Sequence, residues 1–200
     1  MSRPRALATL AVLAAVLAGA LASTAAADPV ALVNALNGTL GPGFPSVGAE
    51  LPFGMIQPGP DTSLPDGSQN QLNYTGYAYE DPDIRGFSLT HFDGAGIHIA
   101  GDLPFMPTTG QVNPADPSGN ASPYSHSSET AQPGYHAVTL ARSGIRTELT
   151  GTLLAAEMRF TFPSTAQANV LAEVSQSTSG PHPGSVTVVG RRELQGSSAT

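Results

Sequence analysis

Glycine and proline occur along the whole chain, and their distribution constrains the fold more than any other feature of the sequence. The 200 residues contain 22 glycines and 18 prolines, which are not gathered into one linker. Proline removes a helical hydrogen bond and glycine interrupts regular structure, so such a chain favours short strands joined by turns. The prolines between residues 44 and 62 exclude a helix there. We expect a loop, a short strand and a turn in that segment.

Seven runs between turn signals are enriched in β-branched or aromatic residues, which is the pattern of β-strands. They are residues 84–90, 102–108, 135–140, 145–152, 156–162, 168–173 and 185–189. These runs predict an all-β fold, an antiparallel β-sandwich. Residues 28–40 have helix-like apolar spacing but are too few to decide their structure. Residues 112–133 are rich in Pro, Ser, Asn and Gly, and we expect a long surface loop there.

The N-terminal residues have the order of a secretory signal peptide. Arg3 and Arg5 precede an apolar run from residue 6 to 22, and Ala25 to Ala27 provide small residues for cleavage. A retained membrane anchor is the alternative, but the run is dominated by Ala and Leu and no basic stop-transfer flank follows it. We expect cleavage after Ala27, secretion of residues 28–200 as one domain, and no membrane attachment afterwards.

The C-terminal residues predict a strand without a partner. Residues 186–189 have strand character, but we expect no closing strand between Arg191 and Thr200. The sequence therefore reads as an incomplete domain, and an exposed strand edge favours aggregation.

Charge and cysteine content exclude two classes of protein. The formal net charge is −7, and a nucleic-acid partner is not expected because phosphate binding requires a basic face. The chain contains no cysteine, so an exported domain of this sequence must be stabilised by its core without disulfides.

The densest group of potentially functional residues lies between Gly86 and Asp102. A strand that ends in Thr90-His91 and continues into a glycine-rich loop places an imidazole and the Asp93 carboxylate where backbone can approach a ligand closely. On this stretch alone, a structural histidine and a simple Asp-Gly turn are the better explanation.

Aromatic and acidic residues occur together in the neighbouring loops. Sugars are bound by such a mixture, because a ring stacks on the apolar sugar face and carboxylates accept from the hydroxyls. The residues are Phe44, Phe53, Tyr74, Tyr77, Tyr79 and Phe92, with Asp61, Glu80, Asp81 and Asp83. Phe44 and Phe53 can equally be core residues, and Phe87, inside a strand, is expected to be one. Three histidines without a partner at metal-ligand spacing are expected to be surface or structural residues: His126, His136 and His182.

Seven motifs follow one another in an order that is more specific than any of them alone. They are GFPSVGAELPFGMIQPGPDT (43–62), GYAY (76–79), IRGFSLTHFDGAG (84–96), GDLPFMP (101–107), PGYHAV (133–138), GIRTELT (144–150) and RFTFP (159–163). Together they resemble the N-terminal β-sandwich domain of glycoside hydrolase family 92.

This resemblance implies a calcium-dependent, inverting exo-α-mannosidase with a C-terminal (α/α)6-barrel domain. In that family the catalytic acid and base, and most Ca²⁺ ligands, come from the barrel. The resemblance therefore implies α-mannoside glycans and the C-terminal domain as partners. It implies no catalytic residue and no metal ligand within these 200 residues, and a fragment that is inactive alone.

By motif position, the resemblance assigns part of the sugar-binding wall to this chain. The residues are Phe44, Pro45, Phe53, Tyr77, Tyr79, Thr90, His91, Asp93, Gly94, Gly96 and Asp102. We expect the aromatic rings to stack on sugar, His91 and Asp93 to contact hydroxyls, and Asp102 to support them. The chain departs from the family pattern at Ser46, where glycine is frequent, and at Asp93, where serine is usual.

Two alternatives stay open at the level of sequence. A free-standing carbohydrate-binding module would bind mannosides without a second domain. A purely structural or adhesive sandwich would contain no sugar site at all.

Overall fold

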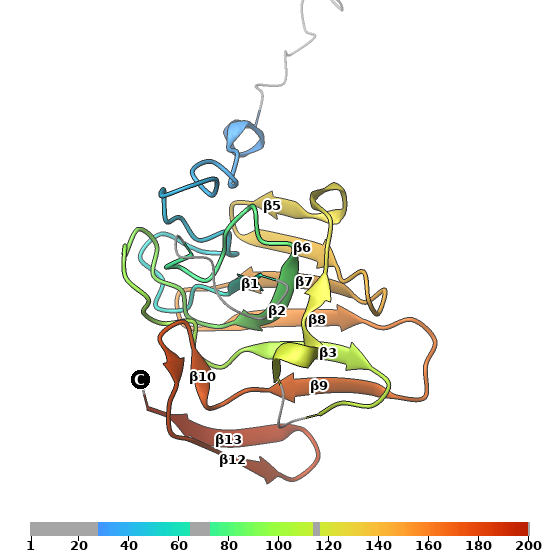
Figure 1. The fold of residues 1–200 in the computed structure, drawn as a ribbon. Coiled ribbons are helices and arrows are strands. Elements are labelled where there is room, and N and C mark those ends of the chain that lie inside the picture. The colour runs from blue at the N-terminus through green and yellow to red at the C-terminus, as the bar shows by residue number, and fades with distance from the viewer. Residues whose placement is uncertain (1–27, 65–72, 114–116, 200) are drawn as a thin grey trace, which may run out of the picture. The chain divides into compact units, whose positions relative to one another are not determined.

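The computed structural model describes residues 28–64, 73–113 and 117–199 (Figure 1). The chain separates into two units, residues 1–32 and 33–200. In the first unit only a short 3-10 turn, η1 (Pro29–Leu32), lies within the described residues. The predicted signal peptide lies outside them. All the strands of the described residues lie in the second unit.

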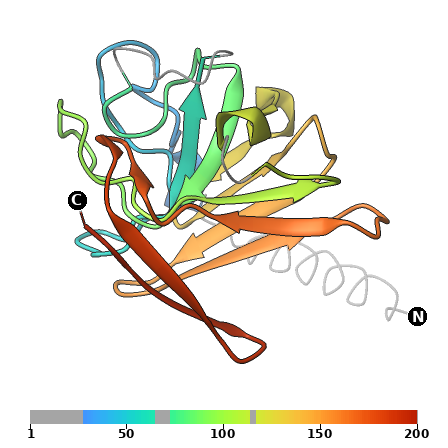
Figure 2. The ribbon, with the colours of Figure 1, turned by 60° about the horizontal axis from the view of Figure 1, so that its bottom comes forward.

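Two antiparallel sheets form the second unit, as the strand pattern predicts. One sheet has the order β1 (Gly59–Ser63), β2 (Asp83–Ser88), β3 (Phe105–Thr109) and β9 (Ala168–Ala172), with β4 (Ser122–Pro123) paired to β2. The other has the order β5 (Thr130–Gln132), β6 (Tyr135–Thr139), β7 (Arg146–Gly151) and β8 (Ala156–Thr161). Two hairpins follow β9, namely β10 (Gln176–Ser177) with β11 (Gly180–Pro181), and β12 (Gly184–Val189) with β13 (Glu193–Ser198). Figure 2 shows the second hairpin, in dark red, extending beyond the sheets.

The hydrophobic core lies between the two sheets. Strand β8 alternates half-buried and exposed residues, as expected for a strand with one face on a core. The Phe87 and Phe160 rings, from opposite sheets, have centroids 6.2 Å apart. The buried members of the core are Ala49, Ile84, Phe87, Met106, Val138, Leu140, Ile145 and Leu149. The all-β sandwich is therefore confirmed, and so is Phe87 as a core residue.

A β-bulge in β2 sets which of its side chains face the core. Asp61 pairs with Gly86 and Thr62 pairs with Ile84, so Arg85 is an extra residue in the ladder. In regular strand geometry, Ile84 and Phe87 would point to opposite faces. The extra residue shifts the alternation, so both side chains are fully buried in the same core. Ser88, beside Phe87, then points away from Phe87 and can bond to Asp61.

Each of the seven predicted strands is present, with shifts of a few residues at the ends. The largest shift is at β3, which begins at Phe105 instead of residue 102. Leu103, just before it, has a φ of 56° and cannot continue an extended strand. Residues 28–40 form η1 followed by turns, with no α-helix, and Val33 and Leu40 of this stretch are exposed.

Two sequence expectations about irregular segments are wrong. Residues 112–133 are not one long surface loop, because they contain η2 (Pro117–Asn120), β4, η3 (His126–Ser128) and β5, and Ala121 and Ser122 are buried. Residues 185–189 do have a partner, since Val186 pairs with Gly196 and Val189 with Glu193 in the β12–β13 hairpin. Both misses involve short or polar strands that carry little apolar alternation.

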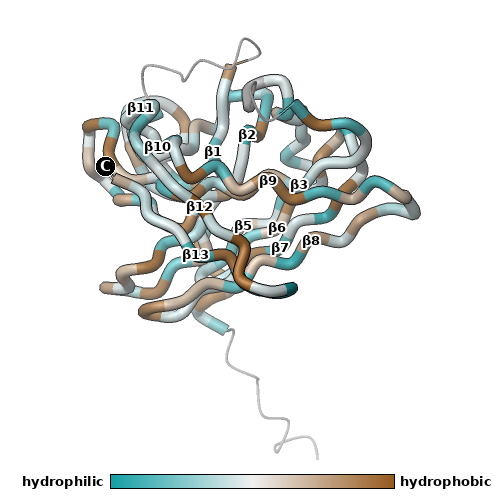
Figure 3. The backbone as a smooth tube through the Cα atoms, turned by 90° about the horizontal axis from the view of Figure 1, so that it is seen from below, coloured by the Kyte–Doolittle hydropathy of each residue, from teal (hydrophilic) through white to brown (hydrophobic). Residues whose placement is uncertain are grey.

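Apolar and polar residues alternate in short stretches along the described chain (Figure 3). Within residues 28–64, 73–113 and 117–199, no helix is long and apolar enough to cross a membrane.

The central position of Phe87 predicts a large loss of stability on truncation. Phe87→Ala should lower the free energy of unfolding by about 3–5 kcal/mol, since it removes a fully buried ring and leaves a cavity. Urea denaturation followed by circular dichroism measures this loss. The matched control is Phe92→Ala, whose ring is 59% exposed, and which should change stability by only about 0.5 kcal/mol. Equal effects of the two changes would contradict the assignment of Phe87 to the core.

Candidate functional site

Three loop segments meet at one end of the sandwich and carry most of the residues that the sequence singles out. We define the loop end as residues 43–57, 73–80 and 89–103. The Thr75 hydroxyl donates to the Pro45 carbonyl at 3.1 Å, which joins two of these segments. Four described residues other than glycine have a positive φ, and all lie here: Phe44, Phe53, Ala100 and Leu103. Strained backbone of this kind collects at functional sites, so the loop end is the candidate site.

His91 lies beneath the surface of the loop end, not on it. The residue is 4% exposed. Its Nε2 lies 3.1 Å from Asp61 Oδ1 and its Nδ1 lies 2.9 Å from the Gln57 carbonyl oxygen. A Cβ at Gly76 would lie 2.8 Å from both His91 Nε2 and Asp61 Oδ1, so only glycine fits over this pair. With both ring nitrogens engaged, His91 has no free nitrogen for a sugar hydroxyl.

The surroundings of His91 favour its protonated form. Burial by itself lowers the pKa of His91, but the hydrogen bond and charge of Asp61 outweigh burial, and the net shift is upward. Both nitrogens face acceptor oxygens, so both hydrogen bonds form when each ring nitrogen carries a proton. His91 therefore ties the segments around Gln57, Asp61 and Gly76 together.

Ser88, Asp61 and His91 contain the residue types of a nucleophilic triad but not its arrangement. The Ser88 hydroxyl donates to Asp61 Oδ2 and lies 3.1 Å from the Gly101 carbonyl oxygen. The carboxylate stands between serine and histidine, so the imidazole does not contact the hydroxyl, and Ser88 is fully buried. The three residues consequently form a buried structural hydrogen-bond network and contain no activated nucleophile.

Asp93 forms the exposed rim of the loop end, in contact with the other residue that departs from the family pattern. The Ser46 backbone N–H donates to Asp93 Oδ1 at 2.5 Å. The next residue, Gly94, donates its N–H to the Phe44 carbonyl at 2.7 Å. These two bonds fix the loop that contains Gly94 and Gly96 against Phe44 and Pro45. The two residues that depart from the family pattern, Ser46 and Asp93, therefore contact each other.

Glu50 is an acidic residue beside this rim that the sequence analysis missed. Burial raises the pKa of its carboxyl and outweighs the opposing effects of Ser46 and His91, and the charge of Asp93 adds a smaller upward effect. Its Oε1 is buried without a hydrogen-bond partner among the described residues. Nothing in the local sequence Ala-Glu-Leu distinguishes Glu50 from a solvated surface acid.

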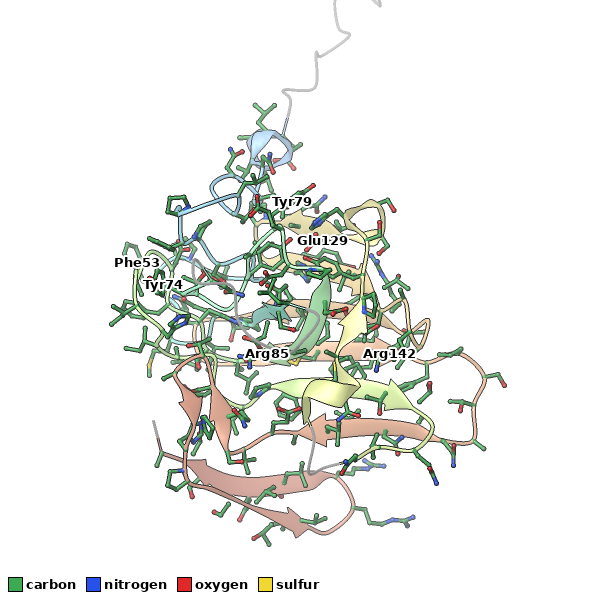
Figure 4. The ribbon with its side chains drawn as sticks, viewed as in Figure 1. Phe53, Tyr74, Tyr79, Arg85, Glu129 and Arg142 are labelled. Carbon is green, nitrogen blue, oxygen red and sulfur yellow. The ribbon has the colours of Figure 1, made fainter. Side chains whose placement is uncertain are left out.

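A row of three rings lines the same part of the loop end. The Phe44 and Tyr74 rings meet edge to face with centroids 4.8 Å apart, and Tyr74 and His98 are 4.7 Å apart. Figure 4 shows Tyr74 near the edge of the loop end, together with Phe53. Phe53 is 102% exposed, so it is not a core residue. His98 was not singled out from sequence, because no neighbour in the chain marks it.

Tyr77 and Tyr79 belong to a second cluster around the buried carboxylate of Glu129 (Figure 4). Tyr77, 3% exposed, donates its hydroxyl to Glu129 Oε2 at 3.1 Å. His126 Nδ1 lies 2.7 Å from Glu129 Oε2 and His136 Nε2 lies 3.0 Å from Oε1. The Tyr79 ring stacks on His126 with centroids 3.7 Å apart. In this geometry Tyr77 has no ring face for a sugar, and one face of Tyr79 is covered.

Glu129 is ionised in this cluster and fastens β5 to the loop end. Burial raises the pKa of Glu129, but the hydrogen bonds from His136 and His126 outweigh burial and the net shift is downward. The expectation that His126 and His136 are surface or structural residues agrees with these contacts. Sequence gives no signal for Glu129, because its hydrogen-bond partners Tyr77, His126 and His136 come from three separate positions in the chain.

Thr90 and Asp102 bind each other at the base of the loop 89–103. The Thr90 hydroxyl donates to Asp102 Oδ2 at 3.0 Å and accepts the Asp102 N–H at 3.0 Å. Both residues are half-buried. They close the loop that carries His91, Asp93 and the two glycines.

The described residues do not by themselves form a cage for Ca²⁺. No group of three or more His, Cys, Asp or Glu that could hold a metal ion occurs within residues 28–64, 73–113 and 117–199. Asp81, a buried acid near the loop end, accepts hydrogen bonds from Thr62 at 2.8 Å and Asn73 at 3.0 Å. Ca²⁺ requires six to eight oxygen ligands, and the described donors do not gather in that way.

Comparison with known proteins places this fold in a defined group. Residues 32–200 match the family model described as the glycosyl hydrolase family 92 N-terminal domain. An uncharacterized secreted glycosidase of Arthroderma benhamiae is 36% identical over 149 residues, which are 71% of this chain and 18% of that protein.

Solved structures of similar fold come from the same group. A family GH92 α-mannosidase of Bacteroides thetaiotaomicron, solved in complex with mannoimidazole, is 39% identical with a TM-score of 0.67, over 73% of this chain and 20% of its own. A family GH92 inverting mannosidase of the same organism is 28% identical with a TM-score of 0.63, over 75% and 20%. This chain thus spans about one fifth of the length of these relatives.

The Asp61–His91 contact predicts a shift in the titration of His91. In Asp61→Asn the pKa of His91 should fall below its ordinary value of 6.5, because burial is then no longer outweighed by a carboxylate. NMR of the His91 ring across pH measures it, with Asp93→Asn at the exposed rim as the control. In the wild type, the stabilisation by His91 is complete below pH 6.5 and is lost as pH rises through the higher folded-state pKa. An unchanged pKa in Asp61→Asn would contradict the pairing.

The Glu129 cluster predicts the opposite dependence on pH. Glu129→Gln should lower the free energy of unfolding at pH 7 by about 1–3 kcal/mol, since it removes the negative charge and replaces one of the two buried acceptor oxygens by an amide donor. The folded-state pKa of Glu129 lies below its ordinary 4.5, so its stabilisation is present above pH 4.5 and is lost as pH falls through the folded pKa. Urea melts at several pH values should show this acid-side loss in the wild type and a flatter curve in Glu129→Gln. Glu157→Gln, at an exposed position, is the matched control, and an equal effect of both changes would refute the role of Glu129.

Proposed function

The chain belongs to glycoside hydrolase family 92 as its N-terminal domain, and we propose that it forms the sugar-facing wall of a secreted α-mannosidase that hydrolyses terminal α-mannosides of glycans. The observation that carries the proposal is the match of residues 32–200 to the family model. Two relatives of the same fold are mannosidases, one of them solved with mannoimidazole. Secretion is supported by the N-terminal signal pattern and by the description of the fungal relative as secreted.

We place the catalytic acid and base outside this chain, in the (α/α)6-barrel domain. An inverting glycosidase needs one carboxylic acid to protonate the leaving oxygen and one carboxylate to activate water, separated by about 6.5–9.5 Å. The buried carboxylates of Asp61, Asp81 and Glu129 are each engaged by internal hydrogen bonds. Their engagement supports a binding role for this domain and a catalytically inactive fragment.

Within the wall, we separate residues that contact sugar from residues that position them. Of the predicted set, Phe53, Asp93, Gly94 and Gly96 are exposed, and Phe44, Pro45 and Tyr79 are half-buried. Among these accessible members we take Phe44, Phe53 and Asp93 as the contact residues. His91, Tyr77, Thr90 and Asp102 are positioning residues, because internal hydrogen bonds use their polar atoms. Tyr74, His98 and Glu50 extend the contact surface beyond the sequence prediction.

We propose a Ca²⁺ requirement for the longer enzyme only. The ion would supply positive charge to orient sugar hydroxyls, with its ligands outside the described residues. This chain's residues bind and orient the sugar and exclude water around it.

The proposal is tested by comparing residues 28–200 with the product of the reading frame beyond codon 200. The longer product should release the aryl group from an aryl α-mannoside, lose that activity with a calcium chelator and regain it on adding Ca²⁺. Residues 28–200 should show no release, since the acid and base are absent. A longer product that folds but releases nothing with Ca²⁺ present would overturn the mannosidase assignment.

A stand-alone carbohydrate-binding module is the alternative that the exposed rim and ring row keep open. It predicts that residues 28–200 bind a mannoside in isothermal titration, and that Phe44→Ala weakens this binding. A purely structural sandwich predicts that neither residues 28–200 nor their Phe44→Ala variant bind the mannoside.

A further inference from the structure

An exposed turn at Asn37–Gly38 has the geometry of a chemically reactive site. The Thr39 N–H donates to the Leu36 carbonyl at 3.2 Å, which closes a β-turn with Asn37 and Gly38 in its centre. Gly38 has a φ of 87°, the value that a type II turn requires at this position and that glycine adopts without strain. Asn37 is exposed to water. The turn therefore presents an amide side chain next to a backbone nitrogen without steric cover.

The atoms that would react are available in this turn. The Gly38 N–H has no hydrogen-bond acceptor among the described residues, so its proton is free to leave. The Asn37 carbonyl oxygen Oδ1 accepts a hydrogen bond from Asn34 Nδ2 at 3.1 Å. That bond draws electron density from the side-chain carbonyl carbon and makes it easier to attack. Asn37 is the one asparagine in the sequence that is followed by glycine.

We propose that Asn37 is a site of spontaneous deamidation and backbone isomerisation. The Gly38 backbone nitrogen bonds to the Asn37 side-chain carbonyl carbon, the bond from that carbon to the amide nitrogen breaks, and ammonia leaves with the proton of the Gly38 N–H. A cyclic imide results, and water opens it at either carbonyl. One opening gives aspartate and the other gives isoaspartate, in which the main chain runs through the former side chain. Water is the only co-reactant.

The Asp93–Gly94 pair shows what protects a similar sequence elsewhere in the chain. Attack there would also come from a glycine nitrogen, but the Gly94 N–H donates to the Phe44 carbonyl at 2.7 Å. The Asp93 carboxylate is held by the Ser46 N–H at 2.5 Å. The Gly94 nitrogen is held by its hydrogen bond and the Gly38 nitrogen has none among the described residues, so the structure distinguishes a reactive turn from a protected one.

Isomerisation at Asn37 would reach the candidate site through Thr39. The Thr39 carbonyl accepts the Tyr79 N–H at 3.1 Å, and a Cβ at Gly38 would lie 3.4 Å from the Pro45 ring. Isoaspartate inserts an extra backbone carbon and so changes the turn that positions Thr39. Aspartate keeps the backbone length and adds only a charge. The two products should therefore affect Tyr79 differently.

The test incubates the purified 200-residue chain under native conditions at mildly alkaline pH, with peptide mass spectrometry over time. The peptide that contains Asn37 should gain the small mass of an amide-to-acid exchange and split into aspartate and isoaspartate forms. Peptides with Asn73 and Asn120 should stay unchanged, and Asp93 should form no isoaspartate. Amide hydrogen exchange at Tyr79 should rise in the isoaspartate form but not in Asn37→Asp.

Two controls make the outcome decisive. Asn37→Gln places the carbonyl one carbon farther from the nucleophile and should abolish the reaction while retaining the side-chain amide. The chain unfolded in urea gives the rate of deamidation at Asn37 without the turn. In that state Asp93 should form isoaspartate, because the hydrogen bond of the Gly94 N–H is lost. The proposal is overturned if Asn37 keeps its amide when native, or if Asp93 isomerises as fast as Asn37 reacts in the folded chain.

Discussion

Polar side chains buried beneath the loop end must find their hydrogen-bond partners inside the protein, since a chain without cysteine has no disulfide to hold its loops. Asp61 and Glu129 meet this constraint in two places. Asp61 joins β1 to Ser88 at the end of β2 and to His91 in the loop that follows. Glu129 joins β5 to Tyr77 and to two histidines. Removing the partners of a buried charge is costly, so these carboxylates keep long irregular loops in one arrangement.

The strands of the sandwich could be predicted from sequence because alternation and turn residues are local signals. Strand β13 escaped prediction, since Glu193–Ser198 is polar and contains glycine, and its place is set by pairing with β12. The segment 112–133 escaped for a similar reason, as β4 and β5 are only two and three residues long. In each case the pairing of backbone with a neighbouring strand, which apolar alternation does not reveal, decided the structure.

For the candidate site, sequence likewise gives the location but not the role of each residue. The motif around His91 and Asp93 lies within the loop end, where glycine and aromatic residues gather. It does not give the roles. His91 and Tyr77 carry groups suited to sugar binding, yet Asp61 and Glu129, far from them in the chain, occupy those groups internally. Residue type therefore predicts where a site lies, and the buried partners decide which side chains can reach a ligand.

The bulge at Arg85 lets a single strand serve two purposes. On one side of it Ile84 contributes to the core, and on the other Phe87 does so while Ser88 turns toward Asp61. Without the extra residue, Ile84 in the core would turn Phe87 to the outside and bring Ser88 into the core. The inward and outward alternation of side chains therefore starts anew after Arg85, so the two halves of β2 present their faces independently. Evolution can change the length or sequence of the loops without rewriting the core, as long as that one extra residue is kept.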